Sequence, residues 1–268
     1  IRSDVLKKIA SDKELSYYAK QPHHNPSVLF NGMINAIIPF TIKGVIWYQG
    51  EGNAGRYQNY TKLMNGLIKN WRDEWGLGDF PFYFVQLAPN GSLGQGNGTS
   101  QAFLREAQLK TMLSVKNTGM AVTLDIGSTI TNHPPEKLLI GKRLAYWALA
   151  KNYGFNTLPY SGPVYESMKV KNNKVYVNFK YAQSGVTSYG KPLNGFEVAG
   201  KDKKFYKADA SIDPHWSAGW ENRSILILSS KHVPNPLYIR YGWKNYIEGT
   251  LYNVEGLPAS SFRSYNFD

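Results

Sequence analysis

The feature that most constrains the fold of this sequence is an alternation of short apolar runs with helical patterns over residues 45–152. The runs VIWYQ, FYFVQLA and MAVTLD begin at Val45, Phe82 and Met120. Continuous apolar runs of this kind are typical of strands buried on both faces of a parallel sheet. After each run comes a segment in which apolar side chains recur every three or four residues, as in an amphipathic helix, and these segments begin at Arg56, Ala102 and Pro135. The order predicts a layered α/β domain, with Pro135 in the first turn of its last helix.

The pattern changes after Tyr153. The segment MKVKNNKVYVNFK alternates apolar and polar residues around Asn172 and Asn173, which predicts a β-hairpin, and further short strand-like runs follow it. We therefore expect an α/β domain over residues 1–158, a linker near GFNTLPYSGP, and a β-rich extension or small β-sandwich over residues 159–268.

Composition narrows the classes of function. The 268 residues include 31 basic and 19 acidic ones, a net charge of +12, but no run of like charges forms a basic arm, so we expect no nucleic-acid partner. The absence of cysteine excludes a disulfide framework, thiolate catalysis and zinc sites built from cysteine. No apolar run approaches the roughly 20 residues of a membrane-spanning helix, so we expect no membrane partner.

Two loops are candidates for a site: QGEGN after the first apolar run, and IGSTITNHPPEK after the third. Ligands of open α/β sheets bind at the carboxyl ends of the strands, where these loops lie. The second of these loops contains His133, which can act as a general base if a carboxylate orients its ring and a nucleophile lies within reach. A lone histidine before two prolines can equally cap or pack. From the residues alone, both interpretations of His133 stay open.

The first loop, QGEGN, holds Gln49, Glu51 and Asn53. In an extended backbone, Gln49 and Glu51 would point the same way, because they are two residues apart. The amide of Gln49 can donate to a developing oxyanion. Glu51 can alternatively be a buried carboxylate satisfied by backbone N–H groups, and we expect the Asn53 side chain to bond the backbone in an Asx-type turn.

Seven blocks from about residue 26 to Arg263 carry a family resemblance. They are SVLFNGMINAIIPFTIKGVIWYQGEGNA, WRDEWGLGDFPFYFVQLAP, LREAQ, NTGMAVTLDIG, HPPEKLLIGKRLA, NGFEVAG and LYNVEGLPASSFR. In this order they resemble the sialate O-acetylesterase family of the SGNH hydrolases. The resemblance implies a three-layer α/β/α domain with a β-rich extension. It also implies a serine esterase that deacetylates sugars without metal or cofactor, in a secreted, periplasmic or lysosomal location.

The resemblance also assigns roles. His133 matches the histidine of the family's HP..K block, and Gln49, Gly50 and Glu51 match its QGE block. The family's orienting aspartate, two or three residues before the histidine, is replaced here by Ile130 and Thr131. We therefore expect Glu51 to orient His133, with Asp125 as the alternative, and Gln49 to help stabilise the oxyanion.

The family's nucleophilic serine lies in a Gly-Gln-Ser-Asn block at the end of its first strand, and this sequence lacks that block. The nearest match, GQGN at Gly94 to Asn97, has glycine in place of serine and follows the wrong strand. We expect the serine to come from an N-terminal segment of the same protein, upstream of this chain. Without that first strand, the chain would be incomplete as a folding unit, with an unpaired strand edge and an exposed groove.

A second hypothesis is a non-catalytic carbohydrate-binding protein on a degenerate scaffold. In that case aromatic residues of the β-rich half, such as Trp216, Trp220 and Trp243, could stack on sugars, although aromatic residues of a core need no such role.

Overall fold

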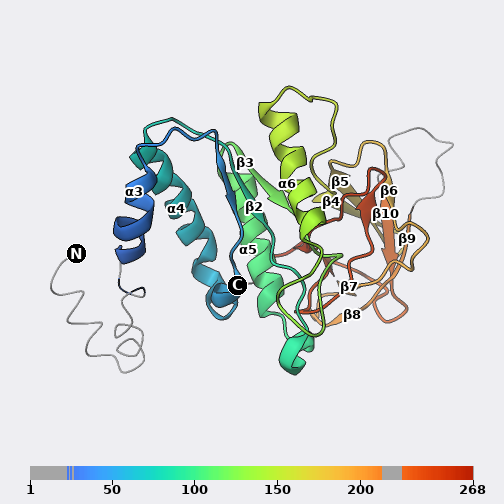
Figure 1. The fold of residues 1–268 in the computed structure, drawn as a ribbon. Coiled ribbons are helices and arrows are strands. Elements are labelled where there is room, and N and C mark those ends of the chain that lie inside the picture. The colour runs from blue at the N-terminus through green and yellow to red at the C-terminus, as the bar shows by residue number, and fades with distance from the viewer. Residues whose placement is uncertain (1–22, 24, 26, 213–224, 268) are drawn as a thin grey trace, which may run out of the picture. The chain divides into compact units, whose positions relative to one another are not determined.

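The computed structural model describes residues 23, 25, 27–212 and 225–267 (Figure 1). Contacts divide the chain into two compact units. The first comprises Ile1–Lys43 and Asn70–Gly78, and the second comprises Gly44–Lys69 and Asp79–Asp268. In the described part of the first unit, a π-helical turn, η2 (Phe30–Ile34), runs into α3 (Asn35–Ile37). The second unit contains the sheets and the candidate site.

The second unit is built on a parallel sheet. Strands β1 (Val45–Trp47), β2 (Phe82–Val85) and β3 (Thr118–Ala121) lie in the order β1-β2-β3, and both pairings are parallel. The predicted α/β class is therefore confirmed. The helices that alternate with these strands are α4 (Tyr60–Trp75), α5 (Ser100–Ser114) and α6 (Lys137–Asn152).

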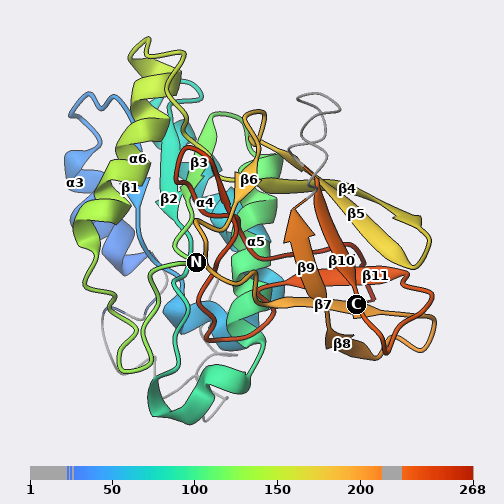
Figure 2. The ribbon, with the colours of Figure 1, turned by 90° about the vertical axis from the view of Figure 1, so that its right-hand side faces the viewer.

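Helices cover both faces of this sheet, α6 on one side and α5 on the other (Figure 2). Trp147 of α6 packs on Tyr83 of β2, with ring centroids 6.0 Å apart. A Cβ at Gly119 would come within 2.3 Å of the Trp147 ring, so only glycine lets α6 approach β3 this closely. All four residues of β2 are buried, as predicted for a strand covered on both faces. The predicted three-layer arrangement is confirmed.

Three local predictions in this domain are wrong. Strand β1 is not buried on both faces, because it lies at an edge of the described sheet and Ile46 is 71% exposed. The helix expected to begin near Arg56 starts instead as a 3₁₀ helix, η3 (Glu51–Asn59), because non-helical angles at Arg56 (φ −134°, ψ 35°) interrupt it before α4. Pro135 lies before α6 rather than in its first turn, because Glu136, with non-helical angles of φ −72° and ψ 51°, is the N-cap and the helix begins at Lys137.

The β-rich half is a sandwich. One sheet has the order β4 (Val164–Lys171), β5 (Lys174–Lys180), β10 (Leu226–Ser229), β9 (Asp209–Ile212). The other has the order β13 (Phe262–Arg263), β11 (Tyr238–Tyr241), β7 (Phe196–Ala199), β8 (Phe205–Lys207). Strands β6 (Val186–Thr187) and β12 (Tyr252–Asn253) form a separate pair.

Aromatic side chains join the two sheets of the sandwich. Phe262 of β13 stacks on Tyr165 of β4 at 5.0 Å and meets Phe179 of β5 edge-on at 5.7 Å. The predicted hairpin is also confirmed, because Asn172 and Asn173 connect β4 to β5 with φ of 49° and 58°. Positive φ at both central residues is the type I′ geometry that asparagine tolerates.

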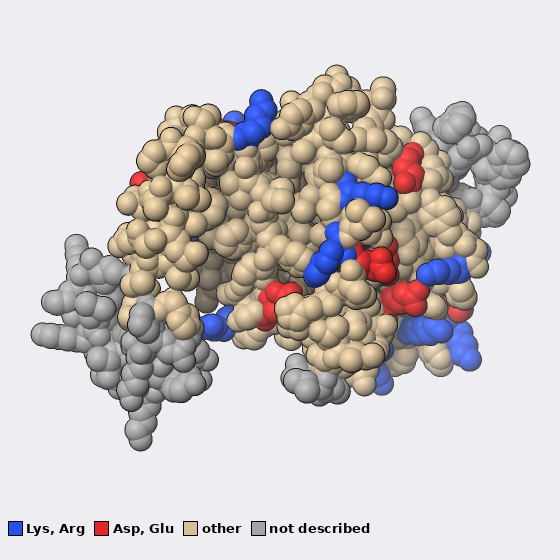
Figure 3. Space-filling model, in the orientation of Figure 1, with Lys and Arg blue, Asp and Glu red and all other residues tan. Residues whose placement is uncertain are grey.

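No described helix has the length and apolar character needed to cross a membrane. On the face drawn in Figure 3, acidic side chains lie among the basic ones.

Candidate active site

The loops that follow β2 and β3 are joined at the carboxyl edge of the sheet. The Gly91 N–H donates to the Ser128 carbonyl at 2.9 Å, and the Ser128 N–H donates to the Pro89 carbonyl at 3.0 Å. At this crossing, a Cβ on Gly127 would lie 2.3 Å from the Pro89 oxygen, so the close approach requires glycine. The loop carrying His133 is therefore held by the loop that follows the central strand.

The loop after β1 reaches the same edge. The ammonium of Lys137, at the start of α6, lies 4.8 Å from the centroid of the Tyr48 ring. Since Lys137 comes four residues after His133 and Tyr48 directly precedes Gln49, this contact brings the two candidate loops together.

The side-chain amide of Gln49 is held on both sides. Its Nε2 donates to Asn53 Oδ1 at 2.8 Å, and its Oε1 accepts from the Tyr60 hydroxyl at 3.4 Å. The expected Asx-type turn is therefore wrong, because the oxygen of Asn53 serves the Gln49 side chain instead of the backbone. An amide nitrogen carries two N–H groups, so one of those of Gln49 remains for a ligand.

Gln108 ties this loop to the sheet. Its amide nitrogen donates to the carbonyls of Val85 at 3.2 Å and Gln49 at 3.4 Å, and its oxygen accepts the Leu87 N–H at 2.8 Å. Gly50 lies against it, so that a Cβ there would come 3.3 Å from the Gln108 nitrogen. A buried residue of α5 thus fixes the loop after β1 relative to the end of β2.

Glu51 is half-buried at the start of η3 and makes no hydrogen bond or ion pair with any described residue. The interpretation as a carboxylate satisfied by backbone N–H groups is therefore wrong. The extended geometry expected for Gln49 and Glu51 is also wrong, because Gly50 has ψ of −34° and the chain turns into η3. Burial, together with the nearby charge of Glu51, raises the pKa of Tyr48 to about 12, so this hydroxyl stays neutral at physiological pH.

His133 is exposed on the loop after β3. Its backbone N–H donates to Thr131 Oγ1 at 3.1 Å, while its imidazole makes no hydrogen bond within the described part of the chain. Ser128 Oγ in turn accepts the N–H groups of Ile130 at 3.1 Å and Thr131 at 3.3 Å. The structure therefore brings His133 and Glu51 to one edge of the sheet but not into contact.

Asp125, the alternative partner for His133, is occupied elsewhere. Arg143 donates to both of its carboxylate oxygens, at 2.8 and 2.6 Å, and also to the Val122 carbonyl at 2.7 Å. The two side chains are 8% and 3% exposed. Of the two carboxylates considered for His133, only Glu51 lacks a partner among the described residues.

Sequence reasoning missed Arg143 and Gln108. Each carried a signal, because each lies three or four residues from apolar residues on the buried side of its helix. Arg143 falls between Ile140 and Trp147, and Gln108 follows Leu104. A charged or amide side chain on a buried stripe requires a buried partner.

Two further expectations concern sugars and metals. Trp243 is 2% exposed and meets Phe103 edge-on at 5.2 Å, so it is a core residue and does not present its face to a sugar. Trp216 and Trp220 lie outside the described residues. Within the described ranges, no three His, Cys, Asp or Glu residues gather as metal ligands would.

The fold and site define an α/β protein with the polar groups of a hydrolase at the carboxyl edge of its sheet. The chain belongs to the family described as carbohydrate esterase, sialic acid-specific acetylesterase, which it matches over residues 14–149. The family predicted from the sequence is therefore confirmed.

Individual relatives agree with this assignment. The mouse sialate O-acetylesterase is 28% identical over 269 residues, covering 88% of this chain and 47% of the relative. The human sialate O-acetylesterase is 28% identical over 274 residues, covering 90% of this chain and 49% of the relative. The crystal structure of a carbohydrate acetylesterase from Xanthomonas citri matches with a TM-score of 0.81 and 37% identity, over 91% of this chain and 55% of that one. The chain spans about half the length of these relatives.

Proposed function

We propose that this chain is a C-terminal part of a serine-type carbohydrate O-acetylesterase, which removes acetyl groups from sialic acid or another O-acetylated glycan. The observation that carries the proposal is that the exposed His133 and Glu51, a half-buried carboxylate without a partner among the described residues, lie in loops at the same edge of the sheet. Family membership supports the same chemistry. A secreted, periplasmic or lysosomal location is part of this proposal.

In the proposed mechanism, His133 accepts the proton of a serine hydroxyl as the serine oxygen attacks the acetyl carbonyl. Glu51 accepts the other ring N–H of the imidazole and stabilises its charged form. His133 then gives the proton to the departing sugar oxygen, leaving an acetyl-enzyme. Water, activated by the same histidine, releases acetate and restores the serine.

Gln49 supplies the oxyanion donor in this proposal. Its second Nε2–H stabilises the negative oxygen of the tetrahedral intermediate. Asn53 fixes which way the amide faces, because its side-chain oxygen accepts from the amide nitrogen, and the Tyr60 hydroxyl lies 3.1 Å from the Gln49 backbone carbonyl and 3.4 Å from the amide oxygen. The donor is therefore oriented before substrate binds.

The serine itself comes, in this proposal, from an N-terminal segment of the same protein that precedes residue 1. Two observations support this source. The chain contains no Gly-Gln-Ser-Asn block, and Ile46 on the edge strand β1 leaves apolar surface that an additional strand would cover.

The source of the serine is testable by covalent trapping. The full-length protein is treated with a fluorophosphonate probe, digested and mapped by mass spectrometry. We expect one labelled serine, upstream of residue 1. A label on Ser128 or on any other serine within residues 1–268 contradicts the proposed source.

The role of His133 is testable by 4-nitrophenyl acetate hydrolysis. We expect His133→Ala to lower kcat at least about 10³-fold, because loss of a triad member removes proton transfer. His232→Ala is the matched control, since His232 stacks on Tyr206 in the β-rich half. Equal rates for His133→Ala and the wild type remove His133 from the mechanism. Sugar binding without release of acetate would support the non-catalytic alternative, which the relatives do not favour.

A further inference from the structure

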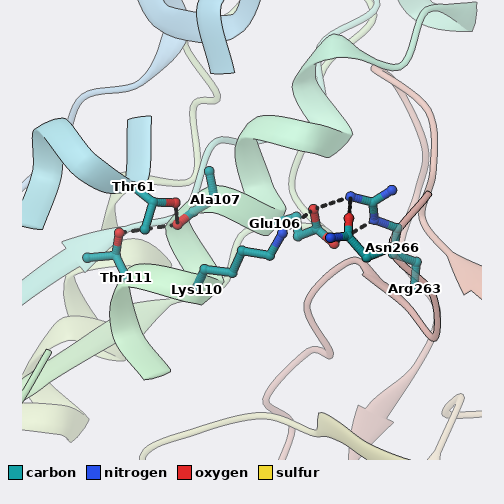
Figure 4. Close-up of polar contacts among 7 residues, drawn as sticks. All are labelled: Thr61, Glu106, Ala107, Lys110, Thr111, Arg263 and Asn266. Atoms are coloured by element: carbon teal, nitrogen blue, oxygen red, sulfur yellow. Dashed lines mark hydrogen bonds and ion pairs between the residues drawn. The ribbon is translucent and has the colours of Figure 1, made fainter. Parts of the chain in front are cut away.

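A cavity of about 390 Å³ shares no residue with the candidate active site. It lies between the end of η3, the face of α5 and the segment that follows β13 (Figure 4). Its volume is within the range of small-ligand pockets, about 300–1,000 Å³. The residues that matter most in its lining are Tyr57, Phe103, Glu106, Lys110, Arg263 and Asn266.

One wall of this cavity is a fixed charge cluster. Arg263 donates to both oxygens of Glu106, at 2.7 and 3.0 Å, and the Lys110 ammonium bonds the same carboxylate at 3.0 Å (Figure 4). The Arg263 and Glu106 side chains are 3% and 13% exposed, whereas Lys110 is 53% exposed. The cluster therefore has a rigid buried part and one accessible cation.

The facing wall is aromatic. Tyr57 stacks on Phe103 with centroids 4.5 Å apart and planes 12° from parallel. The Arg263 guanidinium lies over the Phe103 ring at 5.1 Å, which holds the aromatic pair against the charge cluster. Rings fixed in this way offer a flat apolar surface at little cost in conformational entropy.

Several polar groups of the lining have no protein partner. Within the part of the chain that the structure describes, neither the Tyr57 hydroxyl nor the Gln58 amide makes a hydrogen bond. Lys110 has three N–H donors and uses one on Glu106, and the amide nitrogen of Asn266 donates to no described residue. The cavity thus combines a flat apolar surface with both donors and acceptors.

We propose that this cavity is a subsite for a neutral saccharide unit of the glycan. A pyranose has apolar C–H faces that pack on an aromatic ring, and its hydroxyls each donate and accept hydrogen bonds. An anionic ligand fits less well, because the Glu106 carboxylate stands between the two cations of the wall. An apolar ligand would leave the polar groups of the lining desolvated and unpaired.

The subsite deepens the proposed function and rests on it for the identity of the glycan. Tyr57 comes six residues after Glu51, and the interruption of η3 at Arg56 lies between them, so the extended-chain limit of about 3.6 Å per residue places their Cα atoms at most roughly 22 Å apart. A glycan whose acetylated unit lies at His133 can therefore extend its neighbouring units toward the cavity. The enzyme would then prefer acetylated oligosaccharides to acetylated monosaccharides.

The experiment is isothermal titration calorimetry of the full-length protein with xylotetraose, mannotetraose and chitotetraose. We expect saturable binding of at least one of them, weakened roughly tenfold by Tyr57→Ala. Phe155→Ala, which removes an exposed aromatic ring outside the cavity, is the matched control and should leave binding unchanged. Absence of binding to all three probes, or equal binding by Tyr57→Ala, overturns the subsite.

Two further variants distinguish a loss of binding from a loss of folded protein. Tyr57→Phe keeps the stack on Phe103 and should retain most of the affinity, and Lys110→Ala alters only an exposed side chain and should weaken binding. Full affinity in Lys110→Ala counts against the subsite. Tighter binding of a tetrasaccharide containing glucuronate than of the neutral probes overturns the assignment to a neutral unit.

The subsite and the proposed function can fail separately. His133→Ala should abolish hydrolysis of 4-nitrophenyl acetate while keeping the affinity for the tetrasaccharide. Sugar binding that depends on Tyr57 in a protein without esterase activity leaves the subsite standing and removes the proposed function. Esterase activity, together with tetrasaccharide binding that is unchanged in the Tyr57 and Lys110 variants, removes the subsite and leaves the proposed function standing.

Discussion

At the scale of single residues, the candidate site separates polar groups that hold the loops from groups that remain open. Asp125 and Gln108 are fully used in hydrogen bonds to the fold. Glu51, His133 and one N–H of Gln49 are not. A preorganised arrangement of open polar groups is what a reaction site requires, because donors and acceptors must be in place before substrate binds.

Removing the Gln49 amide should slow the chemical step. We expect Gln49→Ala to lower kcat for 4-nitrophenyl acetate by about 10²–10³ with little change in KM, since an oxyanion donor acts mainly in the transition state. Asn53→Ala should give a smaller loss in kcat, because it frees the amide to rotate. Gln183→Ala, on the exposed surface of the β-rich half, is the control. Unchanged kcat in Gln49→Ala would assign Gln49 to loop structure alone.

Asp125 should matter for stability. Its pair with Arg143 is buried, so we expect Asp125→Ala to lower the free energy of unfolding by about 3–5 kcal/mol, because it strands a buried guanidinium. Glu248→Ala is the matched control, as it breaks an exposed pair with Lys191 and should cost at most about 1 kcal/mol. Urea unfolding measures the free energy of unfolding of each variant. Similar costs for the two variants would contradict the structural role of Asp125.

At the scale of elements, α5 links the two halves of the second unit. Its fully buried Arg105 donates to Ser261 Oγ at 2.9 Å, to the Gly242 carbonyl at 2.9 Å and to the Lys244 carbonyl, all in the β-rich half. Burial lowers the pKa of Arg105 to about 9, which still leaves the guanidinium charged at neutral pH. Burying a cation without a counter-ion costs free energy. The hydrogen bonds that these oxygens accept from the guanidinium offset that cost.

Substitution of Arg105 should loosen this link. We expect Arg105→Met to lower the free energy of unfolding by about 3–5 kcal/mol, because the buried carbonyls lose their donor. Lys110→Met places the same substitution on the exposed side of α5 and should change stability by less than about 1 kcal/mol. Hydrogen exchange should show the largest loss of protection around residues 242–245. Protection there equal to that of the wild type would contradict the link.

The β4–β5 turn gives a second test at this scale. Asn173 has φ of 58°, so we expect Asn173→Val to cost about 1–2 kcal/mol, because a β-branched residue is strained in the left-handed region. Asn173→Gly should be neutral or stabilising. Asn178→Val, within β5, is the control and should not destabilise, since valine favours strands. Thermal unfolding distinguishes these variants.

At the scale of the whole molecule, the sequence predicts the features that depend on local pattern. The order of strands and helices, the Asn172–Asn173 turn and the sandwich all follow from periodicity and turn chemistry. The absence of the family's first strand predicts an unpaired strand edge, but that the edge exposes Ile46 was not predictable, because an edge strand carries the same apolar residues as a central one. The partner of Asp125 was not predictable either, since burial and proximity in space decide it rather than spacing along the chain.

The exposed edge of β1 leads to a prediction about association. We expect residues 1–268, produced alone, to self-associate, because an unpaired strand edge beside an exposed isoleucine favours pairing between chains. Ile46→Lys should shift the population toward monomer in light scattering, while Lys180→Ala, at an exposed lysine that ends strand β5 of the β-rich half, should not. A stable monomer of residues 1–268 would contradict the proposal that an upstream segment covers this edge.

The hydrogen bond from Gln86 to Ser260 has a consequence for synthesis. The Gln86 amide is buried at the end of β2 and donates to Ser260 Oγ at 2.7 Å, across 174 residues of sequence. A ribosome that adds about 5–20 residues per second makes the second partner roughly 9–35 s after the first. Throughout that interval the Gln86 amide nitrogen has only the Arg105 carbonyl, at 3.1 Å, of its two buried acceptors. The α/β half, although translated first, therefore completes this buried hydrogen bond only after residue 260 has been made.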